Sequence, residues 1–202
     1  LSDANSLITN IDINLMKDLK DQYYDESDTL KKRKIEKQLK FLFEEYQDKN
    51  IFNFEINFNE VFIKGGFDIV IGNPPYEILK AEQNKEKNRL KKLLLYDSAF
   101  EGELNYFKLF MCKSMSLLKE NGLLSFIFQY SFLGDKTCSK IRNLALKKNR
   151  IIEIEGFPER DDQKKRVFES AKMSVCTLLL KKENIKEYSF NLSLWKDKFK
   201  KE

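Results

Sequence analysis

The hydrophobic pattern changes character near residue 50. Before it, apolar residues recur every three to five positions, as expected for one stripe of a helix whose other faces are lysine and glutamate. This stripe consists of Leu30, Ile35, Leu39, Leu42, Phe43 and Tyr46. A shorter mixed segment, 15–24, precedes it, and the polar residues 25–28 favour a helix start. Residues 1–50 are therefore predicted to be a helical segment, most simply a hairpin packed on a neighbouring element.

Residues 51–202 alternate instead between strand-like and helix-like stretches. Residues 77–103 are polar and basic, with weak helix signals. The predicted strands are 52–58, 67–71, 123–128, 151–155 and 173–180, and the predicted helices are 104–119 and 136–148. Asn121-Gly122 is expected to stop the first of these helices. Strands that alternate with helices of this length predict an α/β fold, a mostly parallel sheet with helices on its faces.

Composition narrows the possible chemistry. The 202 residues carry a net charge of +5, with 42% hydrophobic and 34% charged residues, which suits a folded core with a charged surface. The chain has no histidine, so it cannot by itself form a Ser-His-Asp or Cys-His catalyst or a His-ligated zinc site, and no metal is predicted. Its cysteines are Cys112, Cys138 and Cys176. They are far apart and odd in number, so we expect buried, reduced thiols in a cytoplasmic protein.

The lengths of the apolar runs and the first residues of the chain bear on membrane insertion and on whether the chain is part of a longer protein. No apolar run approaches the roughly 18 residues of a membrane span, and no signal peptide is recognisable. The chain begins Leu1-Ser2-Asp3 without an initiator methionine, which suggests a piece of a longer protein.

The segment Asn73-Pro74-Pro75-Tyr76 carries the most chemical information. It follows a predicted strand, and ligands of open α/β sheets bind beyond the carboxyl ends of the strands. The two prolines have no N–H, so the loop offers carbonyl acceptors with few donors, and the Asn73 side chain adds another acceptor. Tyr76 adds an aromatic plate. Such a loop suits a planar ring with an exocyclic NH₂ group, and adenine is the obvious candidate.

The string at 67–76, FDIVIGNPPY, resembles the catalytic motif of the gamma-class, S-adenosylmethionine-dependent N6-adenine DNA methyltransferases. The resemblance covers about 52–195, and 52–62 is most similar to large enzymes that fuse a methyltransferase to a restriction nuclease. It implies a Rossmann-like methyltransferase sheet, S-adenosylmethionine as cofactor, and double-stranded DNA with a flipped adenine as substrate in a restriction-modification system. Protein glutamine methyltransferases share the NPPY motif. Methylation of protein glutamine or RNA adenine therefore stays open as an alternative, as does a non-catalytic fragment.

The resemblance also assigns roles to individual residues. It implies catalytic acceptors at Asn73 and Pro74, with Tyr76 beside them, and base stacking by Tyr76 and Phe168 on opposite faces of the adenine. The cofactor-binding residues that it implies are Asn57, Phe58, Pro75 and Phe110. Ordinary structural roles remain the alternative for Asn57, Phe110 and Phe168.

This sequence departs from the family pattern in three places. Asn57 replaces the family's aspartate, and Gln129-Tyr130 replaces a usual proline after a strand. The seven glycines form no Gly-x-Gly, so the glycine loop and the acidic ribose ligand are expected upstream of residue 1. A target-recognition domain is expected beyond residue 202. We therefore interpret 51–202 as a partial catalytic domain that is inactive alone.

Two basic segments have open interpretations. Residues 80–92 contain six Lys or Arg against two Glu, and residues 31–34 are all basic. Each is either a solvated surface or a phosphate-contacting surface, and the second interpretation would make nucleic-acid binding salt-dependent.

Overall fold

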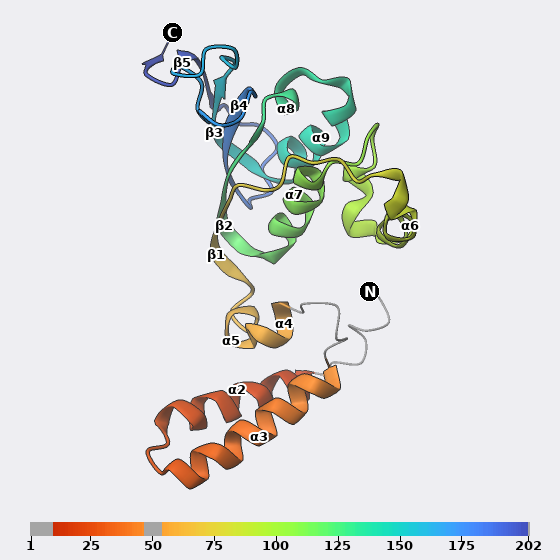
Figure 1. Cartoon of the computed structure of the whole chain (residues 1–202). Coiled ribbons are helices and arrows are strands. Elements are labelled where there is room, and N and C mark those ends of the chain that lie inside the picture. The colour runs from red at the N-terminus through yellow and green to blue at the C-terminus, as the bar shows by residue number, and fades with distance from the viewer. Residues whose placement is uncertain (1–9, 47–53, 202) are drawn as a thin grey trace. The chain divides into compact units, whose positions relative to one another are not determined.

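A computed structural model describes residues 10–46 and 54–201 (Figure 1). The chain divides into two compact units, Leu1–Gly66 (unit 1) and Phe67–Glu202 (unit 2), and each is considered by itself. This division by contacts falls after Gly66. The predicted functional division into 1–50 and 51–202 stays a prediction.

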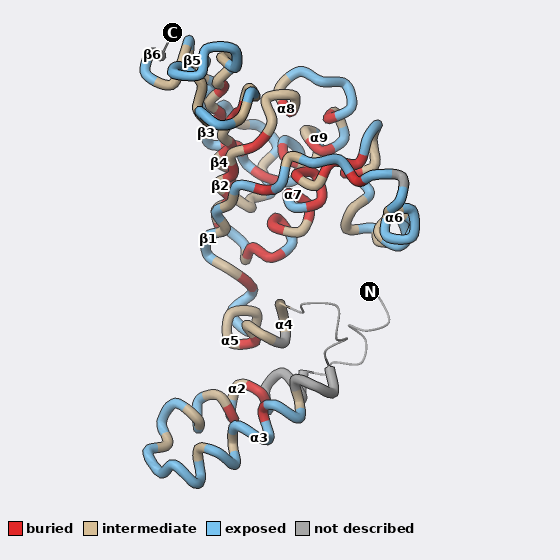
Figure 2. The backbone as a smooth tube through the Cα atoms, viewed as in Figure 1, coloured by how far each residue is buried: buried red, intermediate tan, exposed pale blue. Residues whose placement is uncertain are grey.

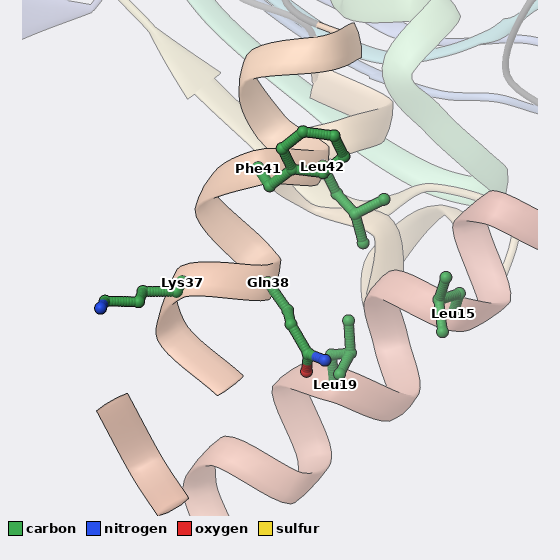
Figure 3. Close-up of a pocket in the computed structure, with 6 residues that line it drawn as sticks. All are labelled: Leu15, Leu19, Lys37, Gln38, Phe41 and Leu42. Atoms are coloured by element: carbon green, nitrogen blue, oxygen red, sulfur yellow. The ribbon is translucent and has the colours of Figure 1, made fainter. Parts of the chain in front are cut away.

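Unit 1 is built around a helical hairpin, as predicted. Its helices are α2 (Asn10–Asp25), α3 (Thr29–Tyr46), α4 (Phe54–Asn57) and α5 (Asn59–Phe62). The Asp28 carboxylate accepts hydrogen bonds from the main-chain N–H groups of Leu30 (2.8 Å) and Lys31 (3.1 Å), so it caps the start of α3. Met16, Leu19 and Leu39 are buried between the two helices. A groove of about 360 Å³ opens beside them, lined by Leu15, Leu19, Lys37, Gln38, Phe41 and Leu42 (Figure 3).

The predicted strand at 52–58 is wrong where the structure describes it, because residues 54–57 form α4. Residues 52 and 53 lie outside the described residues. Phe54 and Phe58 fit an alternating strand, but their spacing of four also places them on one helical face. Their rings stack with centroids 6.3 Å apart, and the Phe58 N–H donates to the Phe54 carbonyl at 2.9 Å. The spacing of four between Phe54 and Phe58 therefore reflects a helical turn and not the two-residue repeat of a strand.

Unit 2 contains a six-stranded sheet in the order β1-β2-β4-β3-β5-β6. Its strands are β1 (Phe67–Gly72), β2 (Leu118–Gln129), β3 (Arg150–Phe157), β4 (Val175–Lys181), β5 (Asn191–Asp197) and β6 (Lys200–Lys201). Its longer helices are α6 (Asn84–Lys91), α7 (Tyr106–Leu117) and α9 (Ser139–Lys148). Its short helical turns are η1 (Ala81–Gln83), η2 (Leu94–Ala99), α8 (Ser131–Gly134) and η3 (Lys136–Cys138). The α/β class is confirmed.

The prediction of a mostly parallel sheet holds for β1, β2, β3 and β5, which run in one direction, and misses the reversed strands β4 and β6. β1 pairs with β2 and β3 with β5 in parallel, but β4 lies between β2 and β3 and is antiparallel to both. The alternation of strands and helices does not reveal this insertion, because the 158–174 connection returns the chain without a crossover helix.

The boundary between α7 and β2 also differs from the prediction. The helix ends at Leu117 and β2 begins at once with Leu118, which is buried and pairs with Phe67. Asn121-Gly122 lies inside the strand, where Asn121 has a φ of 66°. A Cβ on Gly122 would lie 2.9 Å from the Phe67 carbonyl oxygen. These residues therefore allow a close approach of two strands rather than a helix stop.

The helices of unit 2 lie on one face of the sheet (Figure 1). Leu124, Phe126 and Phe128 point to that face and are buried, with the Phe128 ring 5.3 Å from Phe107 of α7 and 5.0 Å from Phe132 of α8. On the opposite face of β1, Ile69 is 56% and Ile71 77% exposed, as the burial colouring shows for this strand (Figure 2). Within the described part of unit 2, no helix covers this second face.

Cys112, Cys138 and Cys176 are buried free thiols, as predicted. Among the described helices, none combines the length and the apolar character that a membrane crossing requires.

Candidate active site

The candidate site begins where β1 ends. β1 stops at Gly72, and residues 73–77 follow as an irregular loop at the carboxyl edge of the sheet. Pro74 is buried, whereas Asn73 and Pro75 are exposed. The Asn73 side chain makes no hydrogen bond to another residue within 10–46 or 54–201, so its Oδ1 is available as an acceptor for a ligand.

Tyr76 is fixed at both of its polar ends. Its hydroxyl donates to the Ile127 carbonyl of β2 at 3.4 Å. Its main-chain carbonyl accepts from Asn105 Nδ2 at 3.2 Å and from Gln129 Nε2 at 2.9 Å. Burial, with a smaller contribution from nearby Cys176, raises the pKa of Tyr76 to about 12. The phenol therefore stays neutral at physiological pH and keeps its donor proton.

The structure brings Phe168 to Tyr76 across more than ninety residues of sequence. The two ring centroids lie 6.3 Å apart, with the planes inclined by 59°. The Phe168 carbonyl accepts from Arg166 Nε at 3.0 Å and from the Ala171 N–H at 3.1 Å. The next residue, Glu169, is paired with Lys198 at 2.6 Å, which lowers the pKa of its carboxyl group. The loop that carries Phe168 is thus held by hydrogen bonds within itself and by the ion pair to Lys198.

The two predicted cofactor residues of unit 2 are both accessible. Phe110 is 45% exposed, although its helical neighbours Phe107, Leu109 and Met111 are buried. It is therefore not a core residue of α7. Pro75 is exposed in the loop after β1.

The other two predicted cofactor residues, Asn57 and Phe58, belong to unit 1. Asn57 ends α4, where its main-chain carbonyl accepts from Lys20 Nζ at 3.0 Å, and Phe58 stacks on Phe54. Their role toward a cofactor stays a prediction.

Asn105 and Gln129 are site residues whose function the sequence did not reveal. Asn105 is only 6% exposed, and its Oδ1 accepts from the Phe107 N–H at 3.1 Å, which caps α7. Gln129 is the last residue of β2. A polar residue before a helix and another at a strand end are detectable signals, but their meeting at Tyr76 depends on the tertiary structure.

Main-chain hydrogen bonds also join the residues after Tyr76 to the residues around the start of α7. The Tyr106 N–H donates to the Glu77 carbonyl at 3.0 Å, and the Leu79 N–H donates to the Leu104 carbonyl at 2.9 Å. The segment that follows the loop is therefore tied to the start of α7 and leads directly into η1 and α6.

Comparison with known proteins places the chain in a family. Residues 3–168 match the family model described as Eco57I restriction-modification methylase. The chain is 31% identical over 127 residues to the type II restriction enzyme and methyltransferase RM.Eco57I of Escherichia coli, which covers 61% of this chain and 12% of that protein. It is 29% identical over 140 residues to the putative type II restriction enzyme and methyltransferase RM.MjaORFECS2P of Methanocaldococcus jannaschii, covering 69% of this chain and 11% of that protein.

A solved structure shares the fold. A nuclease-deletion mutant of the Type ISP restriction-modification enzyme LlaGI, in complex with a DNA substrate mimic, superposes with a TM-score of 0.51 at 15% identity over 72% of this chain and 16% of that chain. The Rossmann-like methyltransferase sheet is thereby confirmed. The family model spans most of the sequence and includes the Asn73–Tyr76 loop, Asn105, Gln129 and Phe168, so the chain belongs to the Eco57I restriction-modification methylase family.

Proposed function

We propose that this chain is the catalytic part of a DNA adenine-N6 methyltransferase of a restriction-modification system. The observation that supports this best is the loop after β1, where the unbonded Asn73 carboxamide precedes Tyr76, whose ring lies beside Phe168. The chain spans about a tenth of the length of the curated relatives it matches, so we propose that the intact enzyme contains further parts. These include a cofactor-binding half and a target-recognition domain.

Asn73 and Pro74 supply the acceptors that the reaction needs. The N6 nitrogen of adenine is a weak nucleophile because its lone pair is delocalised into the ring. Hydrogen bonds from both N6 hydrogens to Asn73 Oδ1 and the Pro74 carbonyl favour a pyramidal nitrogen with a localised lone pair. These bonds strengthen as positive charge develops on the nitrogen, so they stabilise the transition state more than the ground state.

Tyr76 and Phe168 supply the two faces that hold an extruded base. Extrusion costs a few kcal/mol in lost pairing and stacking, and each aromatic contact can return about 1–3 kcal/mol. A sandwiched base needs rings about 7 Å apart, twice the 3.4 Å spacing of stacked bases. The ring centroids lie 6.3 Å apart and the planes are inclined by 59°, so Phe168 has to turn before a base can lie between the two rings.

S-adenosylmethionine is the cofactor of this methylase family and supplies an electrophilic methyl group when bound. The accessible residues of unit 2 fit its adenine ring. Phe110 presents a ring that is 45% exposed on an otherwise buried stretch of helix, and Pro75 presents an exposed apolar surface. We propose that these two residues hold the adenine end, and the same role for Asn57 and Phe58 stays a prediction from the sequence resemblance. The methionine end requires a glycine loop that this sequence does not contain.

α6 supports DNA as the substrate. None of its residues is buried (Figure 2). The helix follows closely after residues 77–79, whose main chain is hydrogen-bonded to the start of α7. The cations of this segment are Lys80, Lys85, Lys87, Arg89, Lys91 and Lys92. Across the described ranges, none of them forms a salt bridge to a carboxylate. We propose that this basic arm, residues 80–92, contacts DNA phosphates beside the site.

The test is methylation of duplex DNA by the intact enzyme that carries this chain, with the product nucleoside identified by mass spectrometry. We expect N6-methyladenine, and we expect Asn73→Ala to lower turnover at least about 100-fold with little effect on folding. Asn191→Ala, at another exposed asparagine of unit 2, is the matched control. Near-normal turnover of Asn73→Ala would contradict the catalytic assignment. Methylation of RNA or glutamine peptides in place of DNA would contradict the substrate.

A further inference from the structure

The loop that carries the acceptors has few main-chain donors with which to anchor itself. Pro74 and Pro75 have no N–H, so the main chain of this stretch is held mainly through its carbonyl groups. Apart from the hydrogen bond that the Tyr76 hydroxyl donates to the Ile127 carbonyl, the groups that fix this loop bring their donors from elsewhere. The Tyr76 carbonyl receives two such donors, Asn105 Nδ2 and Gln129 Nε2, from α7 and β2.

The two amides also fix each other. Asn105 Nδ2 donates its second hydrogen bond to Gln129 Oε1 at 2.8 Å, and Asn105 Oδ1 accepts from the Phe107 N–H. Both hydrogens and the oxygen of the Asn105 amide are thus used, and its near-complete burial leaves little room for water to replace them. Rotation of either amide would break several bonds at once, so the arrangement is rigid.

We propose that Asn105 and Gln129 are positioning residues that hold the Asn73–Tyr76 loop in place for methyl transfer. The inference rests on the proposed function. Asn105 caps α7, the helix that presents Phe110, so a single side chain fixes the base-side acceptors relative to the proposed cofactor-side ring. Gln129 ends β2, and its side-chain amide supplies the second donor to the Tyr76 carbonyl.

The variants are chosen to separate positioning from stability. Asn105→Asp keeps an acceptor that caps α7 but removes the donors to Tyr76 and Gln129, because aspartate and asparagine are similar helix caps. Gln129→Met keeps the length of the side chain and removes both its donor to the Tyr76 carbonyl and its acceptor for Asn105. Asn149→Ala is the control, since Asn149 is also a buried amide, 4% exposed, whose NH₂ donates to a main-chain carbonyl, that of Leu144 at 3.2 Å, in a different part of unit 2.

In the intact enzyme we expect Asn105→Asp and Gln129→Met each to lower kcat about tenfold, the value of the one hydrogen bond to the Tyr76 carbonyl that each variant loses, with KM for S-adenosylmethionine changed less than about twofold. The double variant should lose less than the product of the single effects, because the residues share one network. Hydrogen exchange at the amides of 76–79 should accelerate in both variants. Asn149→Ala should lower the melting temperature and leave kcat and this exchange unchanged.

The outcomes separate this inference from the proposed function. kcat is measured with whichever acceptor the unaltered enzyme methylates. Failure of the unaltered enzyme to methylate DNA adenine overturns the proposed function. Unchanged kcat, or unchanged exchange at 76–79, in a folded Asn105→Asp enzyme overturns the positioning role. A kcat loss that merely follows the melting temperature, as a similar loss in Asn149→Ala would show, overturns it too.

Discussion

Phe168 and Tyr76 show how a residue far away in the sequence acquires a role through its position. Phe168 follows a charged loop and precedes β4, and only the folded chain brings its ring to Tyr76. Tyr76 is held at its hydroxyl and at its carbonyl, whereas Phe168 has its main chain held and its ring half-buried. We therefore expect the Phe168 side chain, and not that of Tyr76, to change its orientation when a base enters the site.

This asymmetry gives a residue-level prediction. In the intact enzyme, Phe168→Ala should weaken binding of DNA with 2-aminopurine at the target position by about tenfold, since a base–aromatic stack contributes about 1–3 kcal/mol. Phe168→Trp should retain part of the affinity because it keeps an aromatic face. Fluorescence of 2-aminopurine reports the extruded base. Binding and methylation like the unaltered enzyme in both variants would make Phe168 a packing residue.

The buried thiols give a second prediction, which depends on pH. Burial raises the pKa of Cys112 and of Cys176 from 9.0 to about 12. A native thiol therefore keeps a proton that the unfolded chain releases above pH 9. The resulting stabilisation is complete below pH 9 and is lost as the pH rises from 9 to 12.

Two measurements check this assignment. The melting temperature should decline from about pH 9 upward. At pH 8, Cys112 and Cys176 should resist a thiol reagent until denaturant is added, and all three cysteines of the chain should then react. Rapid labelling of either residue in the native protein would show that it is accessible.

Among the longer helices of unit 2, α6 is the one without a buried residue, and its Leu90 packs only partly against the core. It follows Leu79, which is buried, and Gln83, whose amide donates to the Tyr106 hydroxyl at 3.0 Å. These anchors fix the start of the basic arm to the segment after Tyr76. A charged helix that follows the proposed base-binding loop in the chain suits a contact with the DNA backbone, whose phosphates have a regular spacing.

The element-level prediction uses the salt dependence of binding. Replacing Lys85, Lys87 and Lys91 by glutamine in the intact enzyme should weaken DNA binding for all sequences alike. It should also reduce the slope of log K against log salt by about 0.9 for each phosphate that the arm no longer neutralises. Lys147→Gln with Lys148→Gln is the matched control, since these exposed lysines end α9. An unchanged slope in the α6 variant would identify the basic arm as a solvated surface.

At the scale of the whole molecule, the side of the sheet that no described helix of unit 2 covers bears on how the chain associates with other protein surfaces. Ile69 and Ile71 of β1 are well exposed, and β1 is the edge strand of the described sheet. Exposed apolar residues on an edge strand favour association with another layer or strand. We expect one of the further parts proposed for the intact enzyme to cover this side of the sheet.

The corresponding prediction concerns the isolated 202-residue chain. It should bind S-adenosylmethionine weakly or not at all in calorimetric titration, because it offers residues for the adenine end alone. It should also bind a hydrophobic dye, and Ile69→Thr with Ile71→Thr should reduce that signal, whereas Ile78→Thr, at an exposed isoleucine outside the strands, serves as control. Micromolar affinity for the cofactor would contradict the proposed division of the site.

Features that depend on local order along the chain were predictable from the amino-acid sequence. The Asp28 cap and the apolar stripe indicated the helical hairpin, alternating segments indicated the α/β class, and the prolines of the loop after β1 indicated an acceptor-rich site. These features can be predicted because helix capping, hydrophobic periodicity and the missing proline N–H each depend on residues only a few positions apart.

Features that depend on contacts between distant segments required the folded chain. Folding inserted β4 between β2 and β3, turned 54–57 into a helix, exposed Phe110, and brought Phe168, Asn105 and Gln129 to Tyr76. Strand order and contacts between distant side chains depend on which surfaces pack together after long loops. No local sequence pattern determines that packing. The acceptors of the loop after β1 were therefore predictable from sequence, whereas the amides that hold this loop were not.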